Sequence, residues 1–232
     1  MTRSTRGLIC VSVLVTEVTA ISPMVAPLSD LIDVIEIRMD GLRTPLTADG
    51  IVDLGKPVLV TNRPTWEGGL FAGKEEDRIA RLNQAMELGV GYVDIELQTA
   101  LQWRAALCAK AKKTGTQVVI SHHDFQGTPS GEQLSIILQQ MITSGADIGK
   151  IVTTAVTPLD TLRVLDLQHE ARAAGFPLSA FCMGAVGAIS RFASVYLGGY
   201  MTYVAPSPEQ ATAPGQITAQ DMHLLTSFLQ AA

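Results

Sequence analysis

The sequence is poor in charged and aromatic residues. Of its 232 residues, 17% are charged and 5% are aromatic, whereas 47% are hydrophobic, and the mean hydropathy is +0.26. This composition is typical of a protein whose strands are covered on both faces. The net charge of −5 and the isoelectric point near 5.3 argue against nucleic acid as the main partner.

Long apolar runs are also missing. No stretch reaches the roughly 18 uninterrupted apolar residues that a membrane-spanning helix needs. The run Leu8–Val15 follows Arg3 and Arg6 and superficially resembles a signal peptide. Glu17 interrupts it, however, and no small-residue cleavage site follows cleanly, so we reject a signal peptide.

Cysteines are few, and no linker is visible. Cys10, Cys108 and Cys182 lie far apart and lack the spacing of metal ligands. They are typical of buried thiols in a reducing compartment, which predicts a cytoplasmic protein. Neither a low-complexity segment nor a linker divides the chain, so we expect one domain over residues 1–232.

Short apolar runs alternate with helical patterns along the whole chain. The runs expected to form strands are Leu8–Val15, Val34–Met39, Pro57–Asn62, Tyr92–Leu97, Gln117–Ser121, residues 145–154, Pro177–Cys182 and Tyr200–Val204. The clearest helical patterns are Glu75–Leu88, Thr99–Lys113, Gly131–Ser144, Leu159–Ala174, Ala188–Leu197 and Thr218–Gln230. Repeated strand–helix units predict a parallel sheet of the α/β class, and eight units predict a (β/α)8 TIM barrel. The alternative is an open doubly wound sheet, although no GxGxxG fingerprint follows the first strand.

Lys150 lies in the middle of a predicted buried strand. Side chains alternate along a strand, so Ile148, Lys150 and Val152 share one face, and Ile151 lies on the other. A buried ammonium group must be paired or must lose its charge. A lysine whose pKa is lowered by burial is a nucleophile suited to Schiff-base formation with a ketone. The alternative is a structural ion pair with a buried carboxylate.

Polar residues recur at the carboxyl ends of the predicted strands and in the loops that follow them. They are Glu36, Arg38, Thr61, Arg63, Asp94, Glu96, Ser121, His122, His123, Asp124, Lys150, Ser190, Arg191, Thr212 and Gln216. Function in a barrel of this type is located at that end, so their convergence indicates a binding or catalytic site. The loop Arg63–Lys74 is long for such a connection, which favours a mobile lid.

Several of these polar residues also have a structural interpretation. Glu36 and Arg38 could form an ion pair with each other. Asp94 and Glu96 could bind backbone amides of the loops, which we favour over catalysis. His122 and His123 are neighbours on a strand, so only one of them can point inward.

Two further polar residues are ambiguous when taken singly. Asp124 could cap its loop. Arg191 at the start of a helix is unfavourable for the helix dipole, which suggests an anionic ligand.

Together, these segments resemble type I 3-dehydroquinate dehydratase. The resemblance covers nearly the whole chain and lies in Glu36-Ile37-Arg38, Thr61-Asn62-Arg63, Glu67-Gly68-Gly69, Asp94-Ile95-Glu96-Leu97, His123-Asp124-Phe125, Thr128-Pro129, Lys150-Ile151, Ile189-Ser190-Arg191 and Pro214-Gly215-Gln216-Ile217. Each motif is short, but their order and spacing together are specific. The resemblance implies a (β/α)8 fold, a dehydration that uses neither metal nor cofactor, and a homodimer.

The resemblance also implies three catalytic roles. Lys150 matches the lysine that forms an imine with the C3 ketone of the substrate, and His123 matches the general acid and base. Glu67 matches the glutamate that orients this histidine. The residue before His123 is itself a histidine, His122, which makes the pair ambiguous, but the His-Asp-Phe register favours His123.

The remaining matches concern substrate binding. Arg191 matches the arginine that clamps the substrate carboxylate, and the further substrate-binding positions are Ser12, Glu36, Arg38, Arg63, Met183, Thr212 and Gln216. Thr212 stands where the family commonly has serine. Phe181 is bulkier than expected and could narrow the site.

The resulting hypothesis is a hydro-lyase that converts 3-dehydroquinate to 3-dehydroshikimate in the shikimate pathway of aromatic amino acid biosynthesis. A class I aldolase of the same fold is one alternative, but no glycine-rich phosphate site is visible at the seventh and eighth loops. A catalytically silent barrel that only binds a metabolite is the other alternative. Such a protein should have lost the lysine, the histidine or the long third loop, and all three are present.

Overall fold

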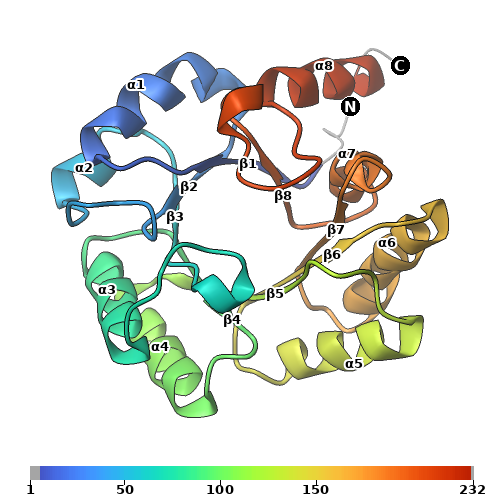
Figure 1. The fold of residues 1–232 in the computed structure, drawn as a ribbon, viewed down its shortest axis with the longest axis horizontal. Coiled ribbons are helices and arrows are strands. Elements are labelled where there is room, and N and C mark those ends of the chain that lie inside the picture. The colour runs from blue at the N-terminus through green and yellow to red at the C-terminus, as the bar shows by residue number, and fades with distance from the viewer. Residues whose placement is uncertain (1–5, 231–232) are drawn as a thin grey trace.

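The computed structural model describes residues 6–230, which form a parallel barrel surrounded by helices (Figure 1). The strands are β1 (Leu8–Val13), β2 (Val34–Arg38), β3 (Val58–Thr61), β4 (Tyr92–Glu96), β5 (Gln117–Asp124), β6 (Ile148–Thr154), β7 (Leu178–Met183) and β8 (Met201–Val204). The helices are α1 (Ile21–Val25), α2 (Ala48–Val52), α3 (Glu75–Glu87), α4 (Leu101–Thr114), α5 (Gly131–Ile142), α6 (Pro158–Ala173), α7 (Ala188–Tyr196) and α8 (Ala219–Gln230). Short 3-10 turns occur at Val18–Ala20, Ala26–Leu31, Thr65–Glu67 and Pro208–Gln210. No helix within this part of the chain is long and apolar enough to cross a membrane.

The strand order identifies the barrel. The sheet runs β7-β6-β5-β4-β3-β2-β1-β8, and β1 pairs in parallel with both β2 and β8. Between β7 and β8 the backbone N–H of Tyr200 donates to the carbonyl of Leu178 at 2.8 Å, and the N–H of Met201 donates to the Ser179 hydroxyl at 3.1 Å. These two bonds bring the first and last strands of the sheet together. The prediction of a (β/α)8 barrel is therefore confirmed, and the open doubly wound sheet is wrong.

Alternation along the strands separates two kinds of core. Side chains inside the barrel come from every strand and are Cys10, Val34, Leu59, Tyr92, Val119, Ile148, Val152, Phe181, Met183, Met201 and Tyr203. The intervening side chains pack against the surrounding helices, as Ile151 does. Ile148 and Val152 thus face the barrel interior with Lys150 between them, as the period-two pattern predicts.

Local sequence signals explain where the helices begin and end. The Ser130 hydroxyl accepts from the N–H of Gln133 in a capping box at the start of α5. Pro158 occupies the first position of α6, and Gly175 follows this helix with φ +67°. These signals are local, so the predicted helix bounds agree with the structure to within a few residues.

One predicted strand boundary is wrong in a way that affects the site. The strand expected to end at Ser121 continues as β5 to Asp124, because His122, His123 and Asp124 pair with β6. The loop Arg63–Lys74 connects β3 and α3 as expected and contains the 3-10 turn Thr65–Glu67, while its mobility as a lid stays a prediction.

Candidate active site

One cavity at the carboxyl ends of the strands collects all the predicted site residues. Its volume is about 540 Å³, counting its open mouth. The predicted residues that line it are Ser12, Glu36, Arg38, Arg63, Glu67, His123, Lys150, Met183, Arg191, Thr212 and Gln216. They come from seven of the eight strands or from the loops after them. The predicted residues therefore lie close enough together to act as one site.

Lys150 projects from β6 into this cavity and is 5% exposed. Its Nζ lies 3.5 Å from Asp94 Oδ2 and 3.7 Å from Glu36 Oε1. Both distances exceed the 2.7–2.9 Å or so of a close charge-assisted bond. The Nζ also lies 3.8 Å from the centroid of the Tyr203 ring. Lys150 thus lies beside two carboxylates, as a structural ion pair would require, while its amine faces the cavity.

Arg63 organises the polar floor of the site. Its guanidinium forms ion pairs with Glu96 at 2.7 Å, Asp94 at 3.0 Å and Glu67 at 3.7 Å, and it donates to the Ser121 hydroxyl at 2.7 Å. Burial by itself raises the pKa of Asp94, but the positive charges of Arg63 and Lys150 outweigh it and hold that pKa below its ordinary value. The interpretation that Asp94 and Glu96 bind loop amides is wrong, because both carboxylates are satisfied by side-chain donors.

Glu36 and Arg38 have separate partners although they share one face of β2. Glu36 accepts hydrogen bonds from the hydroxyls of Ser12 and Thr61. Arg38 instead donates to both carboxylate oxygens of Asp40, at 2.9 and 2.7 Å. The expected Glu36–Arg38 ion pair is therefore wrong, although both side chains line the cavity.

His123 and Glu67 form a close hydrogen-bonded pair in the cavity. His123 Nδ1 lies 2.7 Å from Glu67 Oε1. Burial, together with the nearby charges of Arg63 and Lys150, holds the pKa of His123 well below its ordinary value. Burial also raises the pKa of Glu67 to about 8. A neutral imidazole whose Nδ1–H donates to an ionised carboxylate can accept a proton on the other nitrogen, and the pair reaches this state once Glu67 has lost its proton.

The neighbouring histidine points elsewhere. His122 lines a shallow groove on the outside of the barrel, beside residues of the β5–α5 connection and of α5. This opposite placement follows from strand alternation, which persists because β5 continues past Ser121. The prediction that only one of the two histidines faces the site is confirmed, and the inward one is His123.

Arg191 is a buried cation without a counter-charge. It is 1% exposed, and its guanidinium lies 4.8 Å above the Phe181 ring. One amino group donates to the Pro214 carbonyl at 3.4 Å, and Nε has no partner in the part of the chain that the structure describes. Burial lowers the pKa of Arg191 to about 10. An unpaired guanidinium beside a cavity is a binding site for a planar anion such as a carboxylate.

The β8–α8 connection contributes Thr212 and Gln216 to the cavity wall. Thr212 donates to the Gln216 side-chain oxygen from its N–H at 2.7 Å and from its hydroxyl at 3.1 Å, and its hydroxyl lies 3.2 Å from that of Ser12. Because the Gln216 oxygen is occupied by Thr212, its amide N–H groups are the ones available to a ligand. Met183 lies on the cavity wall.

Sequence reasoning missed two residues of the site. Tyr203 lies under the Lys150 amine, and its place on the inward face of β8 was the available signal. Asp40 binds Arg38, but it follows the end of the strand and no local pattern identifies it.

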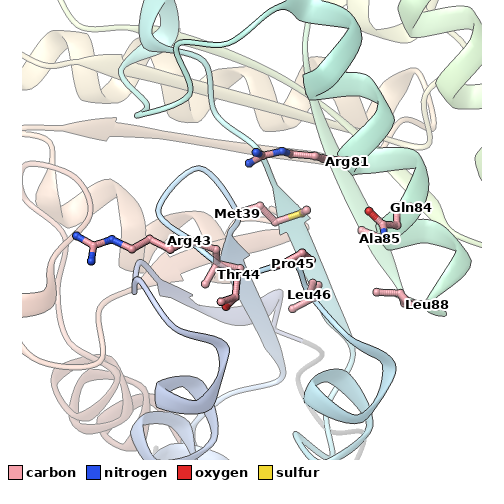
Figure 2. A pocket seen from close by; sticks show the side chains of 10 residues that line it. Met39, Arg43, Thr44, Pro45, Leu46, Arg81, Gln84, Ala85 and Leu88 are labelled. Atoms are coloured by element: carbon pink, nitrogen blue, oxygen red, sulfur yellow. The ribbon is translucent and has the colours of Figure 1, made fainter.

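A second hollow lies outside this site. It has a volume of about 530 Å³ and lies between the β2–α2 connection and α3. In Figure 2, Gln84 and Ala85 of α3 and Leu88, the residue after it, lie opposite Pro45 and Leu46 of the connection. Its lining contains none of the predicted site residues and no carboxylate, histidine or lysine. Its lining therefore offers no side chain of the usual general bases.

A family model, a relative in sequence and two solved structures indicate one family. The family model for type I 3-dehydroquinase matches residues 9–232. A 3-dehydroquinate dehydratase of Desulfotalea psychrophila is 45% identical over 190 residues, which are 82% of this chain and 84% of that protein. The crystal structure of 3-dehydroquinate dehydratase from Geobacillus kaustophilus superposes with a TM-score of 0.88 at 29% identity and covers 98% of this chain and 92% of the other. Type I 3-dehydroquinate dehydratase from Clostridium difficile, solved with covalently modified comenic acid, has a TM-score of 0.86 at 26% identity over 97% of this chain and 93% of its own. The chain therefore belongs to the type I 3-dehydroquinase family.

Proposed function

We propose that this protein dehydrates 3-dehydroquinate to 3-dehydroshikimate and water through an imine on Lys150. The observation that carries the proposal is the single cavity shared by a buried lysine, a histidine of lowered pKa and an unpaired arginine. The covalently modified ligand in the Clostridium difficile dehydratase also supports covalent chemistry in this family.

The first steps belong to Lys150. Its amine attacks the C3 ketone of the substrate, and loss of water leaves a protonated imine. The cationic nitrogen withdraws electrons from C2 and makes the C2 proton far more acidic than it is beside a ketone. When that proton leaves, its electron pair moves into an enamine and neutralises the nitrogen.

His123 moves the proton. Its free nitrogen accepts the C2 proton and then returns a proton to the C1 hydroxyl, which departs as water. Glu67 holds Nδ1 at 2.7 Å and so sets the orientation of the ring. Hydrolysis of the remaining conjugated imine releases the product and restores the Lys150 amine.

The other cavity residues position the substrate. Arg191 clamps the carboxylate, since it is the buried cation that lacks a counter-charge. Glu36, Arg38 and Arg63 receive the ring hydroxyls. Met183 packs against the ring, and Ser12, Thr212 and Gln216 close over it.

Borohydride trapping tests the proposal directly. The protein is treated with 3-dehydroquinate and borohydride, and peptide mass spectrometry locates the adduct. We expect a reduced adduct on the peptide that contains Lys150, and none in the Lys150→Ala variant. A folded protein that yields no adduct would rule out the imine. Release of a smaller carbonyl fragment in place of water would indicate an aldolase.

The two histidines provide a matched pair for the same assay. His123→Ala should still form the trapped adduct but should stall before elimination, because its general base is missing. His122→Ala should keep near-normal turnover, since His122 lies in the outer groove. The reverse pattern would assign the general base to His122.

Assembly, location and metabolic role are part of the same proposal. We propose a cytoplasmic homodimer, built from one catalytic domain over residues 1–232, that serves aromatic amino acid biosynthesis. The three cysteines are free and buried, which is consistent with a reducing compartment. Light scattering coupled to size-exclusion chromatography would measure the assembly, and rescue of a strain auxotrophic for aromatic amino acids would test the role.

A further inference from the structure

Asp40 is a buried carboxylate immediately after β2, and none of the roles above involves it. Its side chain is 0% exposed. Oδ1 accepts from Arg38 Nε at 2.9 Å and from the backbone N–H of Arg63 at 3.2 Å. Oδ2 accepts from Arg38 Nη2 at 2.7 Å and from the backbone N–H of Leu70 at 3.0 Å. Each oxygen thus binds one guanidinium N–H and one loop amide.

This arrangement uses the full acceptor capacity of the group. An ionised carboxylate has about four lone-pair sites, and all of them face donors here. A buried carboxylate that is fully bonded holds its donors in one geometry, because moving any donor leaves a buried polar atom unpaired. Asp40 therefore constrains two separate parts of the cavity wall at once.

The first constrained part is the Arg38 side chain. Nε and Nη2 point at Asp40, so Nη1 is the nitrogen left for the cavity, which Arg38 lines. The fork geometry of the two parallel bonds sets the plane of the guanidinium.

The second constrained part is the loop that carries Glu67. Asp40 binds the loop at Arg63 and at Leu70, which lie on either side of Glu67. Between those points the loop is compact, because the Phe71 N–H donates to the Arg63 carbonyl and a side chain at Gly69 would clash with that carbonyl. Glu67 in turn touches His123. Displacement of this loop would therefore change the orientation of His123.

We propose that Asp40 is a positioning residue that couples substrate binding by Arg38 to acid–base chemistry by the Glu67–His123 pair. The inference rests on the proposed function for its kinetic consequences, but its effect on the loop is independent of the reaction. A small misplacement of a supporting group costs enzymes a large fraction of their rate, so the expected effects are measurable.

The kinetic test is Asp40→Asn. The amide oxygen of asparagine can accept from only some of the four donors. The amide NH2 group would face the remaining donors, so Arg38 and the loop would both lose hydrogen bonds that hold them in place. We expect KM to rise and kcat to fall by about tenfold or more each. In the Arg38→Ala background, Asp40→Asn should no longer raise KM but should still lower kcat. This split would not arise from a uniform loss of folded protein.

Asp33→Asn is the matched control. Asp33 precedes β2, and its carboxylate also binds an arginine and a backbone amide, Arg6 at 2.6 Å and Ile9 at 2.8 Å. It lies at the opposite end of the strand, so its loss should reduce stability without changing kcat or KM. Asp40→Glu keeps the charge but moves the carboxylate along by one methylene. It guards against a variant that simply fails to fold, and it should also lower kcat.

Tryptophan fluorescence reports the loop without reference to the reaction. The chain has two tryptophans, and Trp66 lies within the 3-10 turn of the loop. In a Trp103→Phe background, Asp40→Asn should lower the steady-state anisotropy of Trp66, whereas Asp33→Asn should not. Wild-type kcat, KM and anisotropy in folded Asp40→Asn would overturn the proposal. Failure of the trapping experiment with a lowered anisotropy would remove the reaction and leave the loop constraint standing.

Discussion

At the scale of single residues, the positively charged side chains of the site differ in how many carboxylates lie close to them. Arg63 has three carboxylates within 3.7 Å, and Lys150 has two at 3.5 and 3.7 Å. Arg191 has no ion-pair partner among residues 6–230, although it is 1% exposed. A buried charge without a partner destabilises the fold and is retained where a ligand supplies the opposite charge. The charge pattern therefore predicts that the anionic end of a ligand binds beside Arg191.

Arg191→Leu should therefore increase stability and impair binding. Burial lowers the pKa of Arg191 to about 10, which corresponds to a cost of roughly 3 kcal/mol for keeping the charge in the folded state at neutral pH. We expect a higher urea midpoint and a KM at least about a hundredfold higher. Arg172→Leu is the control, because Arg172 is an exposed residue of α6 that binds only the Leu197 carbonyl. A lower urea midpoint for Arg191→Leu would contradict this account.

The Glu67–His123 pair predicts how activity depends on pH. Below about pH 8 the Glu67 carboxyl is protonated and donates to Nδ1 of His123, which leaves the other nitrogen carrying hydrogen and unable to act as a base. Above that pH the carboxylate accepts from Nδ1–H, and the other nitrogen is free. We expect kcat/KM to rise as the pH rises through about 8.

The free energy of unfolding should fall as the pH rises, whereas kcat/KM should rise. Because the pKa of Glu67 is raised from 4.5 to about 8, its contribution to stability is complete below pH 4.5 and is lost as the pH rises through about 8. Glu67→Gln should abolish the rise of kcat/KM near pH 8 and lower the maximal rate. Persistence of the same pH profile in Glu67→Gln would assign the titration to another group.

At the scale of elements, the connection between β8 and α8 depends on one glycine. Gly215 has φ +71°, and a Cβ there would lie 2.5 Å from the Gly184 carbonyl oxygen. The N–H of Gly184 donates to the Pro214 carbonyl at 3.3 Å, so the segments after β7 and β8 are in contact. This close approach places Thr212 and Gln216 over the cavity. The position therefore requires glycine for both its backbone conformation and its space.

Gly215→Ala should displace this connection. The left-handed conformation costs a residue with a side chain about 1–2 kcal/mol, and relief of the clash would move Thr212 and Gln216 away from Ser12. We expect KM to rise about tenfold. Gly175→Ala is the matched control, because Gly175 has φ +67° and open space around its Cβ position. It should lose similar stability in urea with unchanged KM, and an unchanged KM in Gly215→Ala would show that the connection does not contribute to binding.

At the scale of the whole molecule, the barrel has one weak seam. Neighbouring strands elsewhere form regular ladders, for example over residues 119–124 of β5 and 148–153 of β6. Between β7 and β8 there is no ladder, and the contact depends on the Tyr200–Leu178 backbone bond and the Ser179 hydroxyl. Local opening is easiest where few buried bonds must break. The barrel should therefore open first at this seam.

Hydrogen exchange tests the seam. The Met201 amide should exchange faster than the Ile151 amide, and Ser179→Ala should accelerate it further and lower the free energy of unfolding by about 1 kcal/mol. Ser144→Ala is the control, since its hydroxyl binds Met141 and Ala146 near the end of α5. Equal protection of the Met201 and Ile151 amides would mean that the seam is no weaker than the ladders.

The sequence by itself determined the barrel and the membership of the site. Apolar runs with period two are local properties of the chain, so they reveal the strands and place Lys150 inward beside Ile148 and Val152. A parallel barrel then brings the carboxyl ends of all its strands together. For this reason residues as distant as Glu36 and Gln216 were correctly expected in one cavity. Ser12 and Glu67 were expected there only from the resemblance to the family.

Only the tertiary structure determined which side chains bind one another within that cavity. Arg63 donates a hydrogen bond to Ser121, which is 58 residues away in the sequence. Arg38 pairs with Asp40 and not with Glu36. The extension of β5 to Asp124 likewise depends on pairing with β6. Hydrogen-bond partners and burial depend on side chains that meet only after folding, and the pKa values of Glu67, His123 and Arg191 follow from that burial. Periodicity along the chain carries no information about these contacts, because it reports which face a residue occupies and not which neighbour it finds there.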